Sequence, residues 1–211
     1  MPTRFILVRH GETLANREFR YVGARDDPLS EHGQVQATLL AGALSLLPVV
    51  AVYSSPLLRT YHTALPIAEQ HHVTVQTLDA LRENNFGTWE GLSRAEVLER
   101  STEDKQLLQA WEYDATIAPP AGESFAALQV RVCATVERLA QNHPNQTVVL
   151  VSHVGPIKVL LCTALGAPLS SLLHMFLDPA TISIVDWRQP CPVVRLFNSH
   201  AHLGWERARW M

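Results

Sequence analysis

The chain has 211 residues, of which 47% are hydrophobic and 18% are charged, and its formal net charge is −3 at pH 7. This length and hydrophobic content exclude a disordered chain and allow a substantial buried core. The slightly acidic balance argues against a general binder of nucleic acids or membrane surfaces. No repeat or linker divides the sequence, so we expect one domain over residues 1–211.

Cysteine usage and the N-terminal sequence favour a reducing compartment. Cys133, Cys162 and Cys191 are odd in number and widely spaced, which is typical neither of a disulfide framework nor of a zinc site. The first apolar run stops at Arg9 and is too short for a signal peptide or a membrane span. We therefore expect a cytoplasmic protein with no membrane partner. The sequence predicts no oligomeric state.

Six short apolar segments predict β-strands. In chain order they cover residues 4–9, 49–55, 73–78, 147–152, 181–187 and 193–198. The last two are separated by a proline-rich turn and suit a terminal hairpin. The others are joined by helical segments, and unbroken apolar strands joined by helices are typical of a mostly parallel sheet that is covered on both faces.

Helix signals lie between these strands. Helices are expected from Ser30 to Pro48, after Ser55 and Pro56, from Ser93, over residues 124–142, and from Pro156 to Gly166. Serine is a preferred N-cap, proline is favoured in the first turn, and glycine is common at the end. The alternation predicts an α/β fold, a three-layer α/β/α sandwich with a mostly parallel sheet of roughly six strands.

Two of the expected strands end in a histidine. Residues 4–9 run into His10 beside Arg9, and residues 147–152 run into His153, and a glycine follows each histidine within two residues. In parallel sheets, ligands bind outside the carboxyl ends of the strands. A structural role is a common alternative for one such histidine. Two in matching contexts favour a shared reaction site.

Two more charged residues fall at the same expected edge. Arg59 lies in the first turn of the helix after the second strand, where free N–H groups and the helix dipole suit an anion. Arg9 and Arg59 can converge on one phosphate, and the alternative for Arg59 is a solvated side chain, the usual fate of arginine. Glu83 follows the third strand.

This set of residue types suits phosphoryl transfer. A neutral imidazole is a competent nucleophile near pH 7. Two arginines and a second histidine can stabilise the charged oxygens of the group in transfer, and a carboxylic acid such as Glu83 can protonate the leaving alcohol.

The four blocks that carry these residues resemble the histidine phosphatase superfamily, which is also called phosphoglycerate mutase-like. "LVRHGET" (residues 7–13), with Asn16 three positions on, resembles the N-terminal signature of that family. "SSPLLRTYHTA" (54–64) resembles its arginine segment, "LRENNFGTWEG" (81–91) its acid loop, and "VLVSHVGPIKVLL" (149–161) its second-histidine segment. The blocks occur in the order of the family and span almost the whole chain.

The resemblance implies a role for each matching residue. His10 would be phosphorylated transiently on Nε2, while its Nδ1 donates to a backbone carbonyl, that of Gly11. Glu83 would protonate the leaving oxygen and then activate water. The implied phosphate-binding residues are Arg9, Asn16, Arg59 and His153. The resemblance implies no metal and no cofactor, and the partner is a small-molecule phosphate ester.

Three functions remain open within this family. The insertion typical of the mutases, between the acid loop and Glu123-Ser124, is absent from this sequence, so we favour a phosphatase that hydrolyses a small phosphate monoester. A cofactor-dependent phosphoglycerate mutase is the second hypothesis. A non-catalytic, phospho-ligand-binding regulatory member is the third. Sugar phosphates, phosphoglycerates and α-ribazole phosphate are among the substrates of the family's phosphatases.

Several residues outside the four roles invite a hypothesis, each with a plainer alternative. Candidates for shaping the pocket are Tyr21, Trp89 and Trp111, and candidates for a second anionic group are Arg17, Arg20 and Arg25. Core packing and solvent exposure are their alternatives. Val154 stands where the family commonly has glycine and would narrow the pocket. Lys158 would have a weak substrate role or lie on the surface.

A metal site is a further hypothesis, because histidines occur in two close pairs. These are His71 with His72, and His200 with His202. Neither pair is accompanied by ligands at a zinc spacing, so a structural role is the favoured interpretation.

Overall fold

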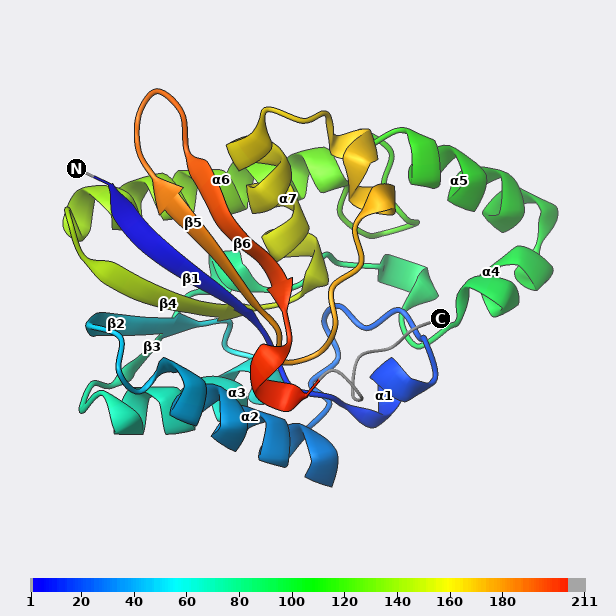
Figure 1. The fold of residues 1–211 in the computed structure, drawn as a ribbon. Helices are drawn as coiled ribbons and strands as arrows, with labels where there is room; N and C mark the ends of the chain where they lie inside the picture. The colour runs from blue at the N-terminus through cyan, green and yellow to red at the C-terminus, as the bar shows by residue number, and fades with distance from the viewer. Residues whose placement is uncertain (1, 205–211) are drawn as a thin grey trace.

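The sheet of the protein has six strands in the order β3-β2-β4-β1-β5-β6 (Figure 1). The computed structural model describes residues 2–204. The strands are β1 (Thr3–Arg9), β2 (Val49–Ser54), β3 (Val75–Thr77), β4 (Thr147–Ser152), β5 (Ile182–Trp187) and β6 (Val193–Ser199). Strands β1 to β4 are parallel to one another. Strand β5 is antiparallel to β1, and β6 is antiparallel to β5. The predicted mostly parallel sheet and terminal hairpin are confirmed.

Helices cover both faces of the sheet, which confirms the three-layer α/β/α sandwich. The α-helices are α1 (Leu14–Arg17), α2 (Glu31–Leu44), α3 (Leu58–Gln70), α4 (Arg94–Arg100), α5 (Thr102–Tyr113), α6 (Phe125–Asn142) and α7 (Val154–Leu165). The short 3₁₀ helices are η1 (Asp79–Leu81), η2 (Gly87–Trp89), η3 (Leu169–His174) and η4 (Ala201–Leu203). Helices α2 and α3 lie on one face, α6 and α7 on the other, and α4 and α5 stand to one side (Figure 1).

The period of a β-strand explains why β1 is apolar throughout. Successive side chains of a strand point to opposite faces. Phe5 and Leu7 belong to the core under α6 and α7, whereas Ile6 and Val8 belong to the core under α2 and α3. All four are buried, and each contributes about 1.5–3 kcal/mol relative to an exposed side chain.

The helix signals in the sequence are mostly confirmed. Ser30 caps α2 by accepting from the N–H of Gly33 at 3.0 Å, and Ser93 with Glu96 forms a reciprocal capping box on α4. Gly166 ends α7 in the left-handed region at φ 63°. Helix α2 stops at Leu44, before the proline that was expected to end it.

Two predicted helix starts and one predicted strand are wrong in their bounds. Helix α3 begins at Leu58 with Leu57 as its N-cap, so Ser55 does not cap it, and the Ser55 hydroxyl contacts a histidine of another strand end. Helix α7 begins at Val154 instead of Pro156. Strand β3 is only three residues long, because it lies at the sheet edge and buries little of its surface.

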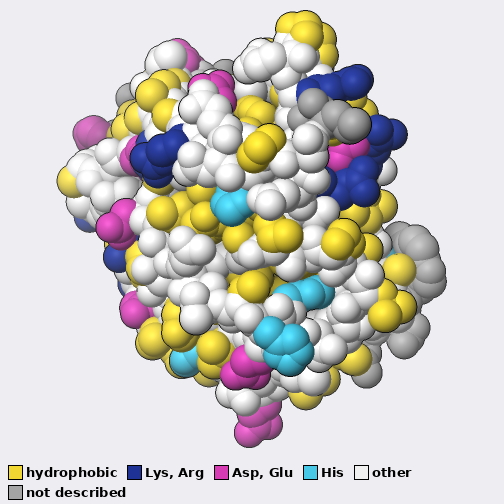
Figure 2. Space-filling view, turned by 90° about the vertical axis from the view of Figure 1, so that its left-hand side faces the viewer, with side chains coloured by type: hydrophobic (Ala, Val, Ile, Leu, Met, Phe, Trp, Pro, Cys, Tyr) yellow, Lys and Arg dark blue, Asp and Glu magenta, His cyan; other side chains and the backbone are white. Residues whose placement is uncertain are grey.

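The surface carries mixed charges. On the face drawn in Figure 2, basic and acidic side chains are interspersed among hydrophobic ones and histidines, without one large patch of a single kind. Within residues 2–204, no helix is both long and apolar enough to cross a membrane. The single domain over residues 1–211 and the cytoplasmic location stay predictions.

Candidate active site

The register of three neighbouring parallel strands places their carboxyl ends together. Arg9 of β1 pairs with Ser152 of β4, and Ser54 of β2 pairs with Val151 of β4. The residues that follow, namely His10, His153 and Ser55, therefore leave the sheet at one edge. The rings of His10 and His153 meet edge to face, with their centroids 5.1 Å apart.

A cavity of about 330 Å³, which we call the catalytic cavity, opens at this edge. Its lining includes five of the six predicted site residues, Arg9, His10, Asn16, Arg59 and Glu83. The sixth, His153, is fully buried against the ring of His10. The structure thus brings together all the residues that the sequence assigned to the site.

His10 is held as a neutral imidazole with a defined tautomer. Its Nδ1 atom lies 2.7 Å from the carbonyl oxygen of Gly11, and a carbonyl only accepts, so Nδ1 carries the proton. Burial lowers the pKa of His10 well below its ordinary value of 6.5, and the charges of Arg59 and Arg9 lower it further. Nε2 therefore has a free lone pair near neutral pH.

His153 is also neutral, and one of its ring nitrogens has no partner. Burial lowers the pKa of His153 well below 6.5, with further lowering by Arg59 and His10. Its Nε2 lies 2.9 Å from Oγ of Ser55. Its Nδ1 is buried without a hydrogen-bond partner in the described part of the chain. A buried polar atom of this kind is costly unless a ligand satisfies it.

Arg59 is buried and held by backbone carbonyls, so a solvated side chain is excluded. Its guanidinium donates to the carbonyl oxygens of Arg25 at 2.6 Å and Gly23 at 3.0 Å. Arg9 donates in the same way to the carbonyl of Leu177. These bonds fix both cations at the cavity, where their charges act on His10.

Glu83 has a pKa that is raised above its ordinary value of 4.5, chiefly by burial. Its Oε1 accepts from the backbone N–H groups of Asn84 and Gly155, both at 2.9 Å, and these bonds together with the charge of Arg59 oppose the rise. A side chain at position 155 would collide with this oxygen, so the glycine lets α7 approach the carboxyl group. Glu83 is thus a protonatable group at the cavity.

Asn16 reaches the cavity because of a local cap. In the short helix α1, Thr13 is the N-cap and accepts from the N–H of Asn16, while Oδ1 of Asn16 accepts from the N–H of Thr13 at 3.0 Å. This reciprocal capping box fixes the amide in one orientation at the cavity wall.

The residues that form this geometry are those of a known family. The chain matches the model of the Histidine phosphatase superfamily (branch 1) over residues 5–200. The protein belongs to this superfamily.

Similarity to individual members extends over nearly the whole chain. The chain is 40% identical over 204 residues to a bifunctional protein of Mycobacterium tuberculosis, covering 96% of this chain but 55% of that protein, so it spans about half the length of this relative. It is 39% identical to phosphoserine phosphatase 1 of Hydrogenobacter thermophilus, covering 95% and 94% of the two chains. The structure of a mycobacterial glucosyl-3-phosphoglycerate phosphatase in complex with VO3 has a TM-score of 0.84 at 29% identity, covering 93% and 99%.

Three contacts of this histidine phosphatase site were not anticipated from the sequence. Ser55 bonds His153, as described above. Thr63 accepts from the N–H of Gly11 at 3.0 Å and donates to the carbonyl of Arg59, which links the loop after His10 to α3. Arg131 donates to the carbonyl of Glu83 at 3.0 Å. Such contacts join residues far apart in the chain and leave no local signal in a single sequence.

Of the predicted pocket-shaping residues, Tyr21 and Trp111 line the catalytic cavity. Trp89 does not: it is fully buried in the core to which Trp111 also belongs, and its Nε1 donates to Asp104 at 2.7 Å. Of the two alternatives for Lys158, a weak substrate role and a plain surface position, the structure does not show the second. Its side chain lines the cavity and donates to the carbonyl of Leu172 at 2.9 Å. Val154 lines the cavity as well.

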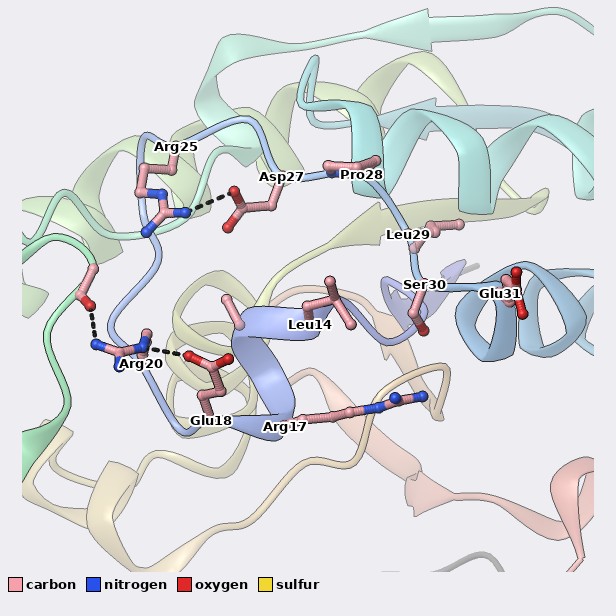
Figure 3. Close-up of a pocket in the computed structure, with 12 residues that line it drawn as sticks. Leu14, Arg17, Glu18, Arg20, Arg25, Asp27, Pro28, Leu29, Ser30 and Glu31 are labelled. Carbon is pink, nitrogen blue, oxygen red and sulfur yellow. Dashed lines mark hydrogen bonds and ion pairs between the residues drawn. The ribbon is translucent and has the colours of Figure 1, made fainter.

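The three arginines proposed for a second anion are already paired with carboxylates. They line a separate hollow of about 750 Å³ that lies beside α1 (Figure 3). Arg17 pairs with Glu12 at 2.8 Å and Arg25 with Asp27 at 3.1 Å. Arg20 pairs with Glu18 at 2.6 Å and is the only one of the three that also lines the catalytic cavity.

The histidine pairs form no cluster with other possible ligands. In the described range, residues 2–204, no group of three or more His, Cys, Asp or Glu side chains is arranged to hold a metal ion. His202 instead bonds the carbonyl of Ala180 at 2.9 Å, which is a structural contact near η4.

Proposed function

We propose that the protein is a phosphatase that hydrolyses small phosphate monoesters through a phosphohistidine intermediate. The observation that carries the proposal is the state of His10, a neutral imidazole whose Nδ1 is held by Gly11 and whose Nε2 is free beside two arginines. Relatives named as phosphatases, at 39% and 29% identity, support this choice.

The first step of the proposed mechanism forms a P–N bond and breaks a P–O bond. Nε2 of His10 attacks the phosphorus atom, and the alcohol leaves on the opposite side. Glu83, whose raised pKa favours the protonated form, donates its proton to the leaving oxygen. The product of this step is phosphohistidine and the free alcohol.

The second step returns the enzyme to its first state. Glu83, now ionised, takes a proton from a water molecule, which attacks the phosphorus of phosphohistidine. The P–N bond breaks, inorganic phosphate forms, and Nε2 of His10 recovers its lone pair. Glu83 again holds the proton needed for the next cycle.

The cationic side chains supply most of the proposed rate enhancement. A well-placed general acid contributes about 10²–10⁴ in rate, whereas hydrolysis of phosphate monoesters is accelerated by up to about 10²¹. Arg9, Arg59 and the unpartnered Nδ1 of His153 would bind the phosphoryl oxygens more strongly as charge develops on them. Asn16 would add one hydrogen bond. The proposal uses no metal and no cofactor.

The proposal is tested with 4-nitrophenyl phosphate as a generic ester. We expect turnover that persists in excess EDTA and disappears in His10→Ala. When the reaction with an ester labelled in its phosphate is stopped with base before the intermediate is hydrolysed, the label should be found on His10. Phosphohistidine survives base and is lost in acid. No turnover of any ester would overturn the proposal and favour a regulatory, phospho-ligand-binding member. Full activity of His10→Ala would overturn the phosphohistidine mechanism.

Phosphatase and mutase share the phosphohistidine and differ in the acceptor. We expect release of inorganic phosphate from monoesters, and no interconversion of 2- and 3-phosphoglycerate either with or without 2,3-bisphosphoglycerate. Interconversion faster than phosphate release would identify a mutase.

A further inference from the structure

Part of the lining of the catalytic cavity is formed by aromatic rings. Tyr21, Phe86, Trp111 and Phe125 all line it, and we call these four residues the aromatic wall. Trp111 and Phe125 stack with ring centroids 5.0 Å apart, Tyr21 lies 5.0 Å from Phe86, and Tyr21 meets Trp111 edge to face at 6.0 Å. The wall is therefore held in place by its own contacts before any ligand binds.

Two further apolar residues of the cavity lining are exposed to solvent. Tyr113 and Leu173 line the cavity, and 79% and 51% of their surfaces are exposed. Apolar surface that remains exposed at a binding site is desolvated when an apolar ligand covers it. These two residues and the aromatic wall thus offer a ligand apolar contacts within one cavity.

Two charged residues of the lining are compensated within the protein. Arg20 and Glu112 line the cavity, but Arg20 pairs with Glu18 and Glu96, and Glu112 pairs with Arg94 at 2.6 Å. Burial raises the pKa of Tyr21 to about 12, so its phenol stays neutral. A carboxylate of a substrate would therefore have to displace an existing partner to find a cation here.

Lys158 is a further cation of the cavity lining, and it also has a partner within the protein. It lies in the second turn of α7, and its Nζ donates to the carbonyl of Leu172 at 2.9 Å. Its pKa is lowered by burial, while the charge of Glu83 raises it.

We infer that the alcohol part of the substrate carries a flat, uncharged ring that lies against the aromatic wall. The inference rests on the proposed function and narrows its substrate class. The cavity volume of about 330 Å³ is near the lower end of the range for small-molecule sites, so it holds a phosphate and one ring system. Phosphoserine, after which the Hydrogenobacter relative is named, has a charged amino acid as its alcohol part and lies outside this class.

Esters of primary alcohols test the inference, because these alcohols are similar leaving groups. Differences in kcat/KM among the esters then report on how the alcohol part is bound. We expect kcat/KM for 2-phenylethyl phosphate to exceed that for ethyl phosphate by about tenfold or more, which is the gain typical of burying one phenyl ring. O-phosphoserine should be no better than ethyl phosphate. A preference for O-phosphoserine, or equal values for ethyl and 2-phenylethyl phosphate, would overturn the inference.

A matched pair of variants assigns the effect to the wall. Phe86→Leu should lower the ratio of kcat/KM for 2-phenylethyl over ethyl phosphate by about threefold or more, since an aliphatic side chain cannot stack on the ring. Phe197→Leu removes an exposed ring on β6 outside the cavity and should leave the ratio unchanged. A fall in both variants, or in neither, contradicts the assignment. Because both esters are measured with the same enzyme preparation, the ratio does not depend on the fraction of enzyme that is folded.

Binding without turnover separates this inference from the proposed function. Calorimetry with 2-phenylethylphosphonate and ethylphosphonate, which are not hydrolysed, should show about tenfold tighter binding of the phenyl compound. If the phenyl compound binds tighter but no ester is hydrolysed, the proposed function fails and the ring site stands. If esters are hydrolysed without any preference in binding, the ring site alone fails.

Discussion

The Nε2 atom of His153 lies 2.9 Å from the Oγ atom of Ser55, and both side chains are fully buried. Ser55 follows β2 and His153 follows the neighbouring strand β4, so the parallel register itself creates this contact. If the serine hydroxyl donates, Nε2 accepts and the proton of the neutral ring resides on Nδ1. Within the described residues, Nδ1 is the atom that has no partner, and in this tautomer it carries a proton that it can donate.

Ser55→Ala should therefore reduce kcat without removing the imidazole. The variant frees Nε2, and the ring then divides between two tautomers, of which only one donates from Nδ1. We expect kcat to fall about tenfold, less than the 10²–10³ that follows the removal of a whole hydrogen-bond donor. ¹⁵N chemical shifts of the His153 ring should report the change of tautomer.

Ser54→Ala is the matched control for this variant. Ser54 is also buried, but its hydroxyl donates to the carbonyl of Ser55 at 2.7 Å, away from the imidazole. We expect it to leave the ¹⁵N shifts of His153 unchanged. Equal kinetic losses in the two variants, with an unchanged tautomer in Ser55→Ala, would show that Ser55 acts only through packing.

Glu83→Gln should lower kcat by about 10²–10⁴ and change the inhibition constant of inorganic phosphate only a few-fold. Glutamine keeps the volume of the side chain and can still accept from the N–H groups of Asn84 and Gly155, but it cannot give a proton to the leaving oxygen. Steady-state kinetics with an alkyl phosphate measures both quantities. An unchanged kcat would remove Glu83 from the role of acid.

The same substitution should alter how stability depends on pH. The pKa of Glu83 is raised in the folded protein, so the folded state binds this proton more tightly than the unfolded state, whose ordinary value is 4.5. The resulting stability is complete below 4.5 and is lost as pH rises through the folded pKa, by about 1.4 kcal/mol per pH unit. In urea unfolding, the free energy of unfolding of Glu83→Gln relative to that of the wild type should increase as the pH rises from 5 to 8. A constant difference over this range would contradict a raised pKa.

Gly155→Ala should separate the position of the acid from its chemistry. A methyl group at this position collides with Oε1 of Glu83 and comes close to Leu128, so the carboxyl group must move. We expect kcat to fall about tenfold or more, because a misplacement of about 1 Å at a reacting group can cost about 10²-fold. Gly42→Ala is the control, since a side chain there meets no atom within 4 Å. An active Gly155→Ala would mean that Glu83 tolerates displacement.

The sequence anticipated the parts of the site that depend on local pattern. His10 and His153 were found because each ends an apolar strand, and Arg59 because a strand leads into its helix. Contacts between side chains that are distant in the chain were not found. Ser55 was interpreted as a helix cap, although its hydroxyl bonds the histidine of an adjacent strand end. Arg25 was a candidate for anion binding, and only the fold shows that Asp27 already pairs with it.

Arg131 is a further residue that no local pattern identified, and it positions the acid from the other side. It lies on α6 and donates to the carbonyls of Ala80 at 2.7 Å and Glu83 at 3.0 Å, while Glu123 holds its guanidinium at 2.7 Å. Arg131→Met should therefore loosen the loop that carries Glu83. We expect kcat to fall about tenfold with little change in the inhibition constant of phosphate.

A double-mutant cycle tests whether Arg131 acts through Glu83. If it does, adding Arg131→Met to Glu83→Gln should lower kcat by much less than Arg131→Met does alone, because the acid is already absent. Arg138→Met is the control, since Arg138 is an exposed arginine of the same helix, seven residues on. Additive losses in the cycle would mean that Arg131 supports catalysis by a route other than the acid loop, such as its charge near His153.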